Sequence, residues 1–82
     1  MSMNKFIVTA VGEGRMDIVS RISMLYLQRH IKVESLVFKP AEDGQSSYEV
    51  VAYADEQTIR RLMGQMFHVE GLQYIDYEIL NK

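Results

Sequence analysis

Apolar and polar positions follow two different periods in the first half of the chain. Residues 5–11, KFIVTAV, are rich in β-branched and aromatic residues and predict a strand. Over residues 17–30 the apolar positions recur at the spacing of a helix with one buried face. Residues 31–39 return to a strand-like pattern with almost no linker. The first half therefore predicts a strand, a helix and a second strand.

The second half of the chain repeats this order. Pro40 and Gly44 mark a loop, and residues 47–54 predict a third strand. Asp55 is placed to cap a second helix, in which apolar residues recur at i, i+3, i+4 and i+7. Residues 72–80 alternate as a fourth strand. Right-handed crossovers would place both helices on one face of a four-stranded antiparallel sheet, so the chain predicts the α+β class, as a ferredoxin-like βαββαβ sandwich.

The second strand lies at an edge of the sheet in this topology, and its sequence is apolar and little protected. Strict alternation predicts that one of its faces holds Val33, Ser35 and Val37 and the other holds Glu34, Leu36 and Phe38. An exposed edge strand invites pairing with a second copy. We therefore expect a homodimer through the second strand, and the alternative is an edge that is solvated or covered by a tail. The residues expected at the dimer edge are Val33, Ser35, Leu36 and Val37.

Length and composition narrow the possible functions. The 82 residues predict a single domain over residues 1–82, whose small core favours dimerisation. The absence of cysteine excludes disulfides, thiolate zinc sites and cysteine nucleophiles. The formal net charge of −2 argues against a nucleic-acid partner. We find no apolar run of the roughly 18–20 residues that span a membrane, and no signal-peptide pattern, so we expect a cytoplasmic protein without a membrane partner.

A glycine pair between the first strand and helix raises the possibility of a phosphate-binding loop. Gly12-x-Gly14 follows a strand and precedes a helix, but Asp17 stands where a dinucleotide fingerprint has its third glycine. A carboxylate at a helix N-terminus would also repel phosphate. The pair is therefore interpreted as an ordinary tight turn.

The other candidate chemistry is weak. His30 and His68 lie near predicted helix ends without partners at metal-ligand or catalytic spacing, so we interpret them as capping or surface residues. Asp76 and Glu78 share one face of a strand, and the alternating pattern indicates a solvated outer face. We expect no catalytic residue, no metal site and no cofactor.

The same fold plan occurs in RNA-recognition motifs, which stack bases on aromatic residues of the central strands. Here Tyr48 and Tyr53 of the third predicted strand fall on opposite faces, and the strand has Glu49 and no basic residue. Metal-chaperone domains of this plan need a cysteine pair, which the sequence lacks. Both of these functions are disfavoured.

The segment of residues 19–36 resembles the helix-to-strand segment of the ACT domain in the acetohydroxyacid synthase (acetolactate synthase) small-subunit family. The typical form there is close to LSR-x-x-x-LF-x-x-RG-x-x-IESL. The start of the second predicted helix, Asp55-Glu56-Gln57, also resembles the family, and the likeness extends over about residues 5–77. The positions that fall on the central pattern are Val19-Ser20-Arg21, Leu25, Arg29 and Val33-Glu34-Ser35-Leu36.

This resemblance implies a non-catalytic regulatory subunit that activates the thiamine-diphosphate-dependent catalytic large subunit in branched-chain amino-acid biosynthesis. The partners it implies are that large subunit, a second copy of the chain and an amino-acid effector. The short members of the family consist of the ACT part alone, and this chain resembles them.

The loop that binds valine in the family differs in this chain. The family's Asn-x-x-Gly turn has its Asn at the position of Gly14 and its Gly at the position of Asp17. At roughly 4 Å and an effective dielectric near 20, the Asp17 carboxylate would oppose a ligand carboxylate by about 4 kcal/mol, or on the order of a thousandfold in affinity. We therefore expect weak or lost valine binding. The resemblance places the ligand contacts at Glu13, Gly14, Asp17 and Ile18, with Lys32 and Val33 supplied by the neighbouring subunit's second strand.

Two other functions stay open. One is a stand-alone ACT-like sensor dimer for a different small molecule, in which Arg15 and Lys32 attract an anionic ligand. The other is an acylphosphatase-like hydrolase, which needs an arginine-bearing phosphate loop. Residues 11–15 only loosely fit such a loop, because an acidic residue lies inside it.

Overall fold

The first strand and the first helix are followed by a hairpin, a second helix and a last strand, in the order that the sequence predicts. The computed structural model describes residues 3–80, so residues 1–2 and 81–82 of the predicted domain lie outside the described residues. The elements are β1 (Asn4–Gly12), α1 (Met16–Gln28), β2 (Lys32–Lys39), β3 (Ser46–Ala54), α2 (Glu56–Met66) and β4 (Leu72–Ile79).

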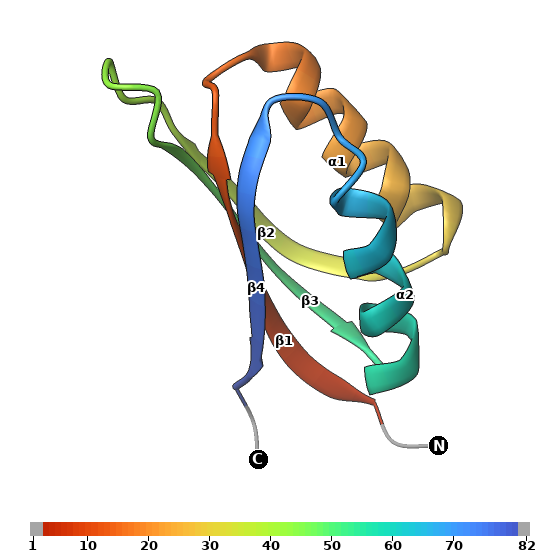
Figure 1. Cartoon of the computed structure of the whole chain (residues 1–82). Helices are drawn as coiled ribbons and strands as arrows, with labels where there is room; N and C mark the ends of the chain where they lie inside the picture. The colour runs from red at the N-terminus through yellow and green to blue at the C-terminus, as the bar shows by residue number, and fades with distance from the viewer. Residues whose placement is uncertain (1–2, 81–82) are drawn as a thin grey trace.

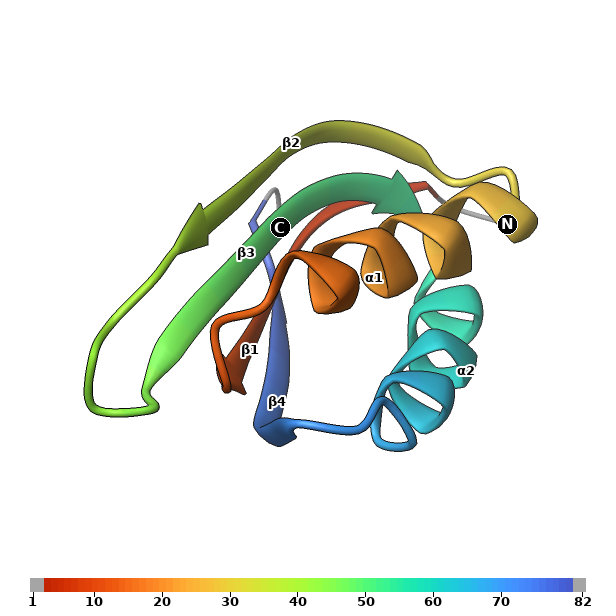
Figure 2. The same cartoon turned by 90° about the horizontal axis from the view of Figure 1, so that it is seen from above.

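The four strands form one antiparallel sheet in the order β2-β3-β1-β4. Both helices cover the same face of this sheet, and the other face carries no helix (Figures 1 and 2). The predicted ferredoxin-like α+β fold is confirmed, and β2 is an edge strand as expected.

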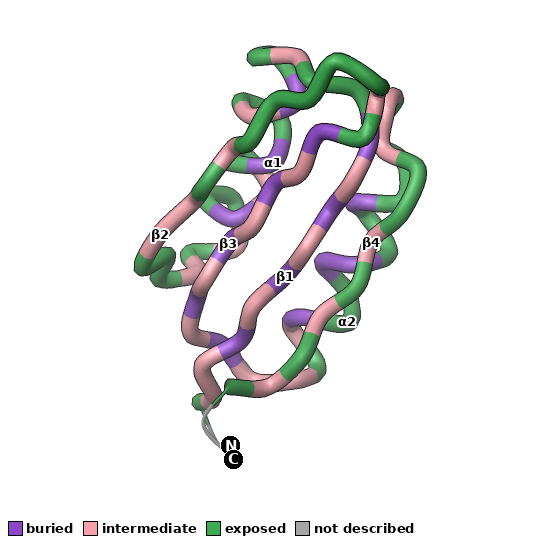
Figure 3. The backbone as a smooth tube through the Cα atoms, turned by 90° about the vertical axis from the view of Figure 1, so that its left-hand side faces the viewer, coloured by how far each residue is buried: buried purple, intermediate pink, exposed green. Residues whose placement is uncertain are grey.

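The core lies between the sheet and the helices. Buried and half-buried residues alternate along the two central strands, β1 and β3 (Figure 3), because successive side chains of a strand point to opposite faces. The two helices contribute residues at helical spacing. The buried side chains of the helices are Ile18, Ile22 and Tyr26 from α1 and Ile59, Leu62, Met63 and Met66 from α2.

The edge strand β2 departs from strict alternation. Val33 pairs with Ala52, but Ser35 pairs with Val51, so Glu34 is an extra residue in a β-bulge. Val33 consequently lies on the helix side of the sheet with Leu36. The prediction that Val33 shares a face with Ser35 and Val37 is therefore wrong, and so is the prediction that Glu34 shares a face with Leu36 and Phe38. The inserted residue exchanges the two faces of the strand for the residues before Ser35.

The displaced Glu34 side chain is held on the outer face of the sheet. Its carboxylate accepts a hydrogen bond of 2.7 Å from the Tyr53 hydroxyl and lies 3.3 Å from the ammonium of Lys5. The hydrogen bond from Tyr53 and then the one from Lys5 lower the pKa of Glu34 below its ordinary value. These contacts tie the bulge of β2 across β3 to β1.

Two helix ends have well-defined caps, whereas Arg15 at the start of α1 makes no side-chain cap hydrogen bond. Asp55 caps α2 as predicted, accepting a 2.8 Å hydrogen bond from the Thr58 backbone N–H. Beyond the end of α1, His30 adopts a φ of 56°, which is the left-handed region usually occupied by glycine. The His30 and Ile31 N–H groups donate to the carbonyls of Leu27 and Tyr26, so His30 ends the helix in a Schellman motif.

One tyrosine in the core lacks a polar partner. Tyr26 is only 1% exposed, and its hydroxyl has no hydrogen-bond partner among the described residues. Burial raises the pKa of this hydroxyl, so it stays protonated. A buried hydroxyl without a partner costs about 1–3 kcal/mol in desolvation.

We therefore expect Tyr26→Phe to keep the stability of the fold or to raise the free energy of unfolding by about 1 kcal/mol. The matched control is Tyr48→Phe, because Tyr48 is equally buried but its hydroxyl is hydrogen-bonded. The control variant should lose about 1–2 kcal/mol. Urea denaturation of the three chains measures both effects. A loss from Tyr26→Phe as large as that from Tyr48→Phe would contradict this description of the core.

Candidate functional site

The loop between β1 and α1, residues 13–15, is pinned by the hydroxyl of a buried tyrosine. Tyr48, at the start of β3, donates a hydrogen bond to the Glu13 carbonyl and accepts one of 3.2 Å from the Arg15 N–H. Its ring stacks on that of Phe38, with ring centroids 4.8 Å apart. On the other side, the Glu13 N–H donates to the Gly71 carbonyl at 3.0 Å. The loop backbone is therefore held by β3 on one side and by the residue that precedes β4 on the other.

Gly14 lies directly against the side chain of Ser46. A Cβ added at position 14 would collide with the Ser46 hydroxyl oxygen, which itself accepts a 2.8 Å hydrogen bond from the Ala41 N–H. Phe38 lies 3.5 Å from the same point. A larger side chain at position 14 would therefore require Ser46 to move.

Arg15 gathers the polar groups of the loop around its guanidinium. Its Nη1 lies 2.6 Å from a Glu13 oxygen, and its Nε and Nη2 lie 3.0 and 3.3 Å from the two oxygens of Asp17. Nη2 also donates to the Glu70 carbonyl at 3.4 Å. The hydrogen bond with Arg15 lowers the pKa of Asp17, and the same bond raises the pKa of Arg15.

This ion network changes the expected effect of Asp17 on a ligand. The predicted repulsion assumed an unpaired carboxylate, whereas Arg15 offsets much of the Asp17 charge. The same network uses each guanidinium nitrogen of Arg15 within the chain. An anionic ligand at the loop would therefore meet two carboxylates and an arginine that is already paired. The same arrangement disfavours a phosphate-binding loop of the acylphosphatase kind.

The structure brings together only part of the predicted ligand site. Glu13, Gly14 and Asp17 lie at the start of α1, where Ile18 is buried in the core. Lys32 and Val33 begin β2, which reaches the loop only at Phe38, about 17 Å further along the strand. One protomer cannot combine the two groups. A shared site would need the second strand of another copy, as the resemblance implies.

The four residues expected at the dimer edge lie on both faces of β2. Val33 and Leu36 line a hollow of about 360 Å³ beside α1, together with Tyr26 and Leu27. Ser35 and Val37 lie on the outer face, where Val37 is 40% exposed. The bulge interrupts the strand before Ser35, so the regular part of the free edge runs over residues 35–39.

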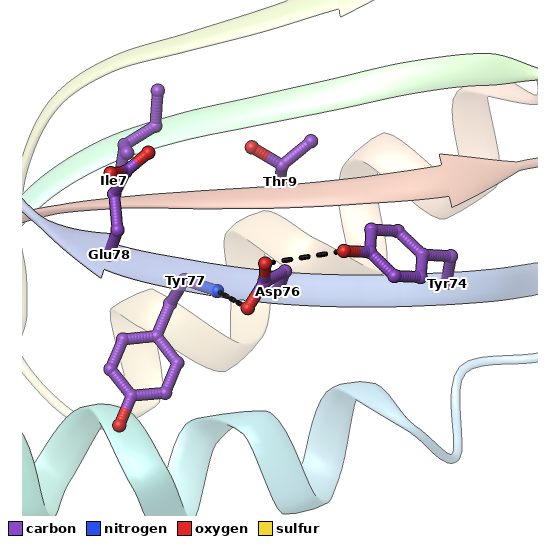
Figure 4. A pocket seen from close by; sticks show the side chains of 6 residues that line it. All are labelled: Ile7, Thr9, Tyr74, Asp76, Tyr77 and Glu78. Carbon is purple, nitrogen blue, oxygen red and sulfur yellow. Dashed lines mark hydrogen bonds between the residues drawn. The ribbon is translucent and has the colours of Figure 1, made fainter.

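The acidic pair that the sequence singles out lies on β4. Asp76 and Glu78 are exposed on the outer face of β4, as predicted, beside a shallow hollow of about 320 Å³ (Figure 4). Asp76 accepts hydrogen bonds from the Tyr74 hydroxyl at 3.2 Å and the Tyr77 N–H at 2.8 Å.

Residues 3–80 contain no group of three histidine, cysteine or acidic residues placed to hold a metal ion. Within the same residues, neither helix has the length and apolar character needed to cross a membrane.

Sequence reasoning missed what holds the loop. The role of Tyr48 depends on hydrogen bonds to residues more than 30 positions earlier in the chain, which no local pattern indicates. A local signal for the ion network does exist: Glu13-x-Arg15-x-Asp17 places an arginine between two acids. Such spacing in a short loop indicates an internal ion cluster.

No protein-family model matches this sequence, and no curated protein matches it. The fold has several counterparts among solved structures. The ACT domain of a GTP pyrophosphokinase from Chlorobium tepidum superposes with a TM-score of 0.79 at 14% identity, over 94% of this chain and 100% of that one. The acetolactate synthase small subunit of Thermotoga maritima gives 0.75 at 15% identity, over 89% of this chain and 46% of that one.

The acylphosphatase of Bacillus subtilis has a similar fold, with a TM-score of 0.70 at 12% identity, over 99% of this chain and 88% of that one. At these identities the likeness establishes the fold alone. The fold is shared by ACT domains and by an enzyme, so the function has to be argued from the site.

The Arg15 network generates a prediction for acid titration. In Arg15→Gln the pKa of Asp17 should rise toward its ordinary value, because the main cause of its lowering is removed. A carboxylate whose pKa is lower in the folded state stabilises the fold at pH values above its pKa in the unfolded chain. This stabilisation is lost as the pH falls through the folded-state pKa. The stability difference between the wild-type chain and the variant should therefore be present at neutral pH and disappear as the pH falls through the lowered folded-state pKa of Asp17.

Carboxyl-carbon NMR titration of both chains tests this directly. Asp55 is the internal control, since its pKa is lowered mainly by the Thr58 backbone N–H and should not change in the variant. Equal Asp17 midpoints in the two chains would show that Arg15 does not hold this carboxylate in solution.

Proposed function

We propose that the chain is a non-catalytic regulatory subunit that activates the catalytic large subunit of acetolactate synthase in the cytoplasm. The observation that carries the proposal is the segment of residues 19–36, in which Val19-Ser20-Arg21 and Val33-Glu34-Ser35-Leu36 fall on the LSR and IESL of that family's pattern. This segment lies in α1 and β2 of an ACT-like fold. The likeness in fold to the Thermotoga small subunit agrees with it. The whole of residues 1–82 is proposed to act as this one domain.

Valine sensing is weak or lost in this proposal. The position of the family's Asn is closed by Ser46 against Gly14, and the first turn of α1 carries Asp17. A ligand carboxylate at this helix N-terminus would compete with Glu13 and Asp17 for Arg15. Binding would have to break contacts that the free chain already makes, which lowers affinity.

A second candidate is a stand-alone sensor dimer that binds a different small molecule. The hollow beside Val33 and Leu36 favours it, because this hollow is mainly apolar and lies at the proposed dimer edge. A dimer through β2 would place the hollows of the two copies near each other. This candidate needs no catalytic partner.

Reconstitution with a catalytic large subunit from the same organism separates the two candidates. We expect the rate of acetolactate formation to rise when the chain is added. The rate should stay at that level when valine is then added at a concentration that saturates the valine-binding members of the family. No rise in rate, together with no complex on size-exclusion chromatography, would overturn the regulatory function and favour the sensor. A rise that valine abolishes would overturn only the proposed loss of sensing.

The proposed dimer is tested by Val37→Lys. Lysine on an exposed edge strand opposes pairing with a second copy, so the variant should sediment as a monomer while the wild-type chain sediments as a dimer. The matched control is Tyr74→Lys on the opposite edge strand, which should stay dimeric. A monomeric wild-type chain, or dissociation caused only by Tyr74→Lys, would exclude dimerisation through β2.

A further inference from the structure

The strand at the other edge of the sheet, β4, pairs with β1 on one side and with no strand of residues 3–80 on the other. Leu80 donates its N–H to the Lys5 carbonyl at 2.8 Å, and bonded and non-bonded positions alternate along an antiparallel pair. Counting back from Leu80, the N–H and carbonyl groups that point away from β1 belong to Ile75, Tyr77 and Ile79. Such a row of backbone groups is a template for another strand.

One carboxylate covers the middle of this free edge. One Asp76 oxygen accepts a hydrogen bond of 2.8 Å from the Tyr77 N–H, and the other accepts one of 3.2 Å from the Tyr74 hydroxyl (Figure 4). The Asp76 charge, and then this hydrogen bond, raise the pKa of the Tyr74 hydroxyl, which therefore stays a donor. The middle N–H of the free edge is thus already bonded within its own strand.

The residue that carries this N–H is also held on the opposite face of the sheet. The Tyr77 hydroxyl donates to the Glu56 carboxylate of α2 at 3.3 Å, and its ring packs edge-on against Phe6, with ring centroids 5.7 Å apart. These contacts fix the side chain of Tyr77, while Asp76 is exposed on the outer face. Another strand could use the Tyr77 N–H only after displacing the carboxylate, which would then lose hydration beside the new strand.

We propose that Asp76 blocks the free edge of β4 against pairing with a strand of another copy of the chain. The incoming strand would have to bring a carbonyl oxygen to the Tyr77 N–H, where the carboxylate both occupies the donor and repels that oxygen. The inference goes beyond the proposed function and needs no catalytic partner.

The block has a consequence for the size of the assembly, and this part alone rests on the proposed dimer through β2. Two copies that pair through β2 still present two β4 edges, one at each end of the combined sheet. Free β4 edges would join such dimers into an open row, because each added dimer presents another edge. With Asp76 in place the assembly closes at two copies.

Hydrogen exchange of the backbone amides, followed by NMR, tests the bond itself. After correction for intrinsic rates, the Tyr77 N–H should exchange about tenfold more slowly than those of Ile75 and Ile79, which have no side-chain acceptor among the described residues. In Asp76→Ala, at a dilution where the variant does not associate, the Tyr77 rate should rise to theirs. Glu78→Ala is the matched control, because it removes a carboxylate from the same face of β4 but no backbone bond.

Sedimentation velocity over a series of concentrations tests the block. Asp76→Ala should form species larger than the wild-type chain, with a share that grows with concentration, because its β4 edge is a free template. Glu78→Ala should keep the wild-type size. Combining Asp76→Ala with Tyr74→Lys should restore that size, since lysine on an edge strand opposes pairing.

The outcomes separate the inference from the proposed dimer and the proposed function. The inference is overturned by a Tyr77 N–H that exchanges as fast as its neighbours on the edge, by a wild-type size for Asp76→Ala, or by equal growth in Asp76→Ala and Glu78→Ala. A monomeric wild-type chain overturns only the dimer through β2. In that case association of Asp76→Ala supports the inference, and a monomeric Asp76→Ala overturns it.

Discussion

The hydroxyl of Tyr48 is the constraint on which the loop between β1 and α1 depends. It bonds the backbone on both sides of Gly14, while its ring is fixed by burial and by stacking on Phe38. With the backbone fixed there, Gly14 meets Ser46 and the Arg15 side chain turns toward Glu13 and Asp17. A buried hydroxyl with two partners is costly to displace, because breaking either bond leaves a polar group unsatisfied. The loop is thereby closed by the chain itself.

The start of α1 is occupied by contacts that the chain makes with itself. The polar groups of the loop at this end are paired with one another, because Arg15 binds both Glu13 and Asp17. An anionic ligand at this end would have to displace these contacts, which lowers its affinity.

Much of the fold could be predicted because it depends on local periodicity and capping. The alternation of β1 and the helical spacing of α2 follow directly from burial of one face, and Asp55 caps its helix as its sequence position indicates. The faces of β2 could not be predicted, because a bulge at Glu34 depends on pairing with β3 and on the contacts with Tyr53 and Lys5. The alternation of side chains along a strand does not indicate where one extra residue is inserted as a bulge.

The position of the loop before α1 could be predicted from the sequence, but the contacts that hold the loop could not. The spacing of Gly14 and Asp17 marked the loop and the start of α1, and both lie there. Whether the loop is open depends on Tyr48 and Ser46, which approach it from distant positions in the sequence.

Isothermal titration of valine into the purified chain tests most directly whether the loop is closed. The account predicts no saturable heat, because Arg15, Glu13 and Asp17 satisfy one another and Ser46 occupies the space beside Gly14. Saturable binding of valine with micromolar affinity to the wild-type chain would contradict it. Such binding would mean that the loop opens at little cost and that sensing is retained.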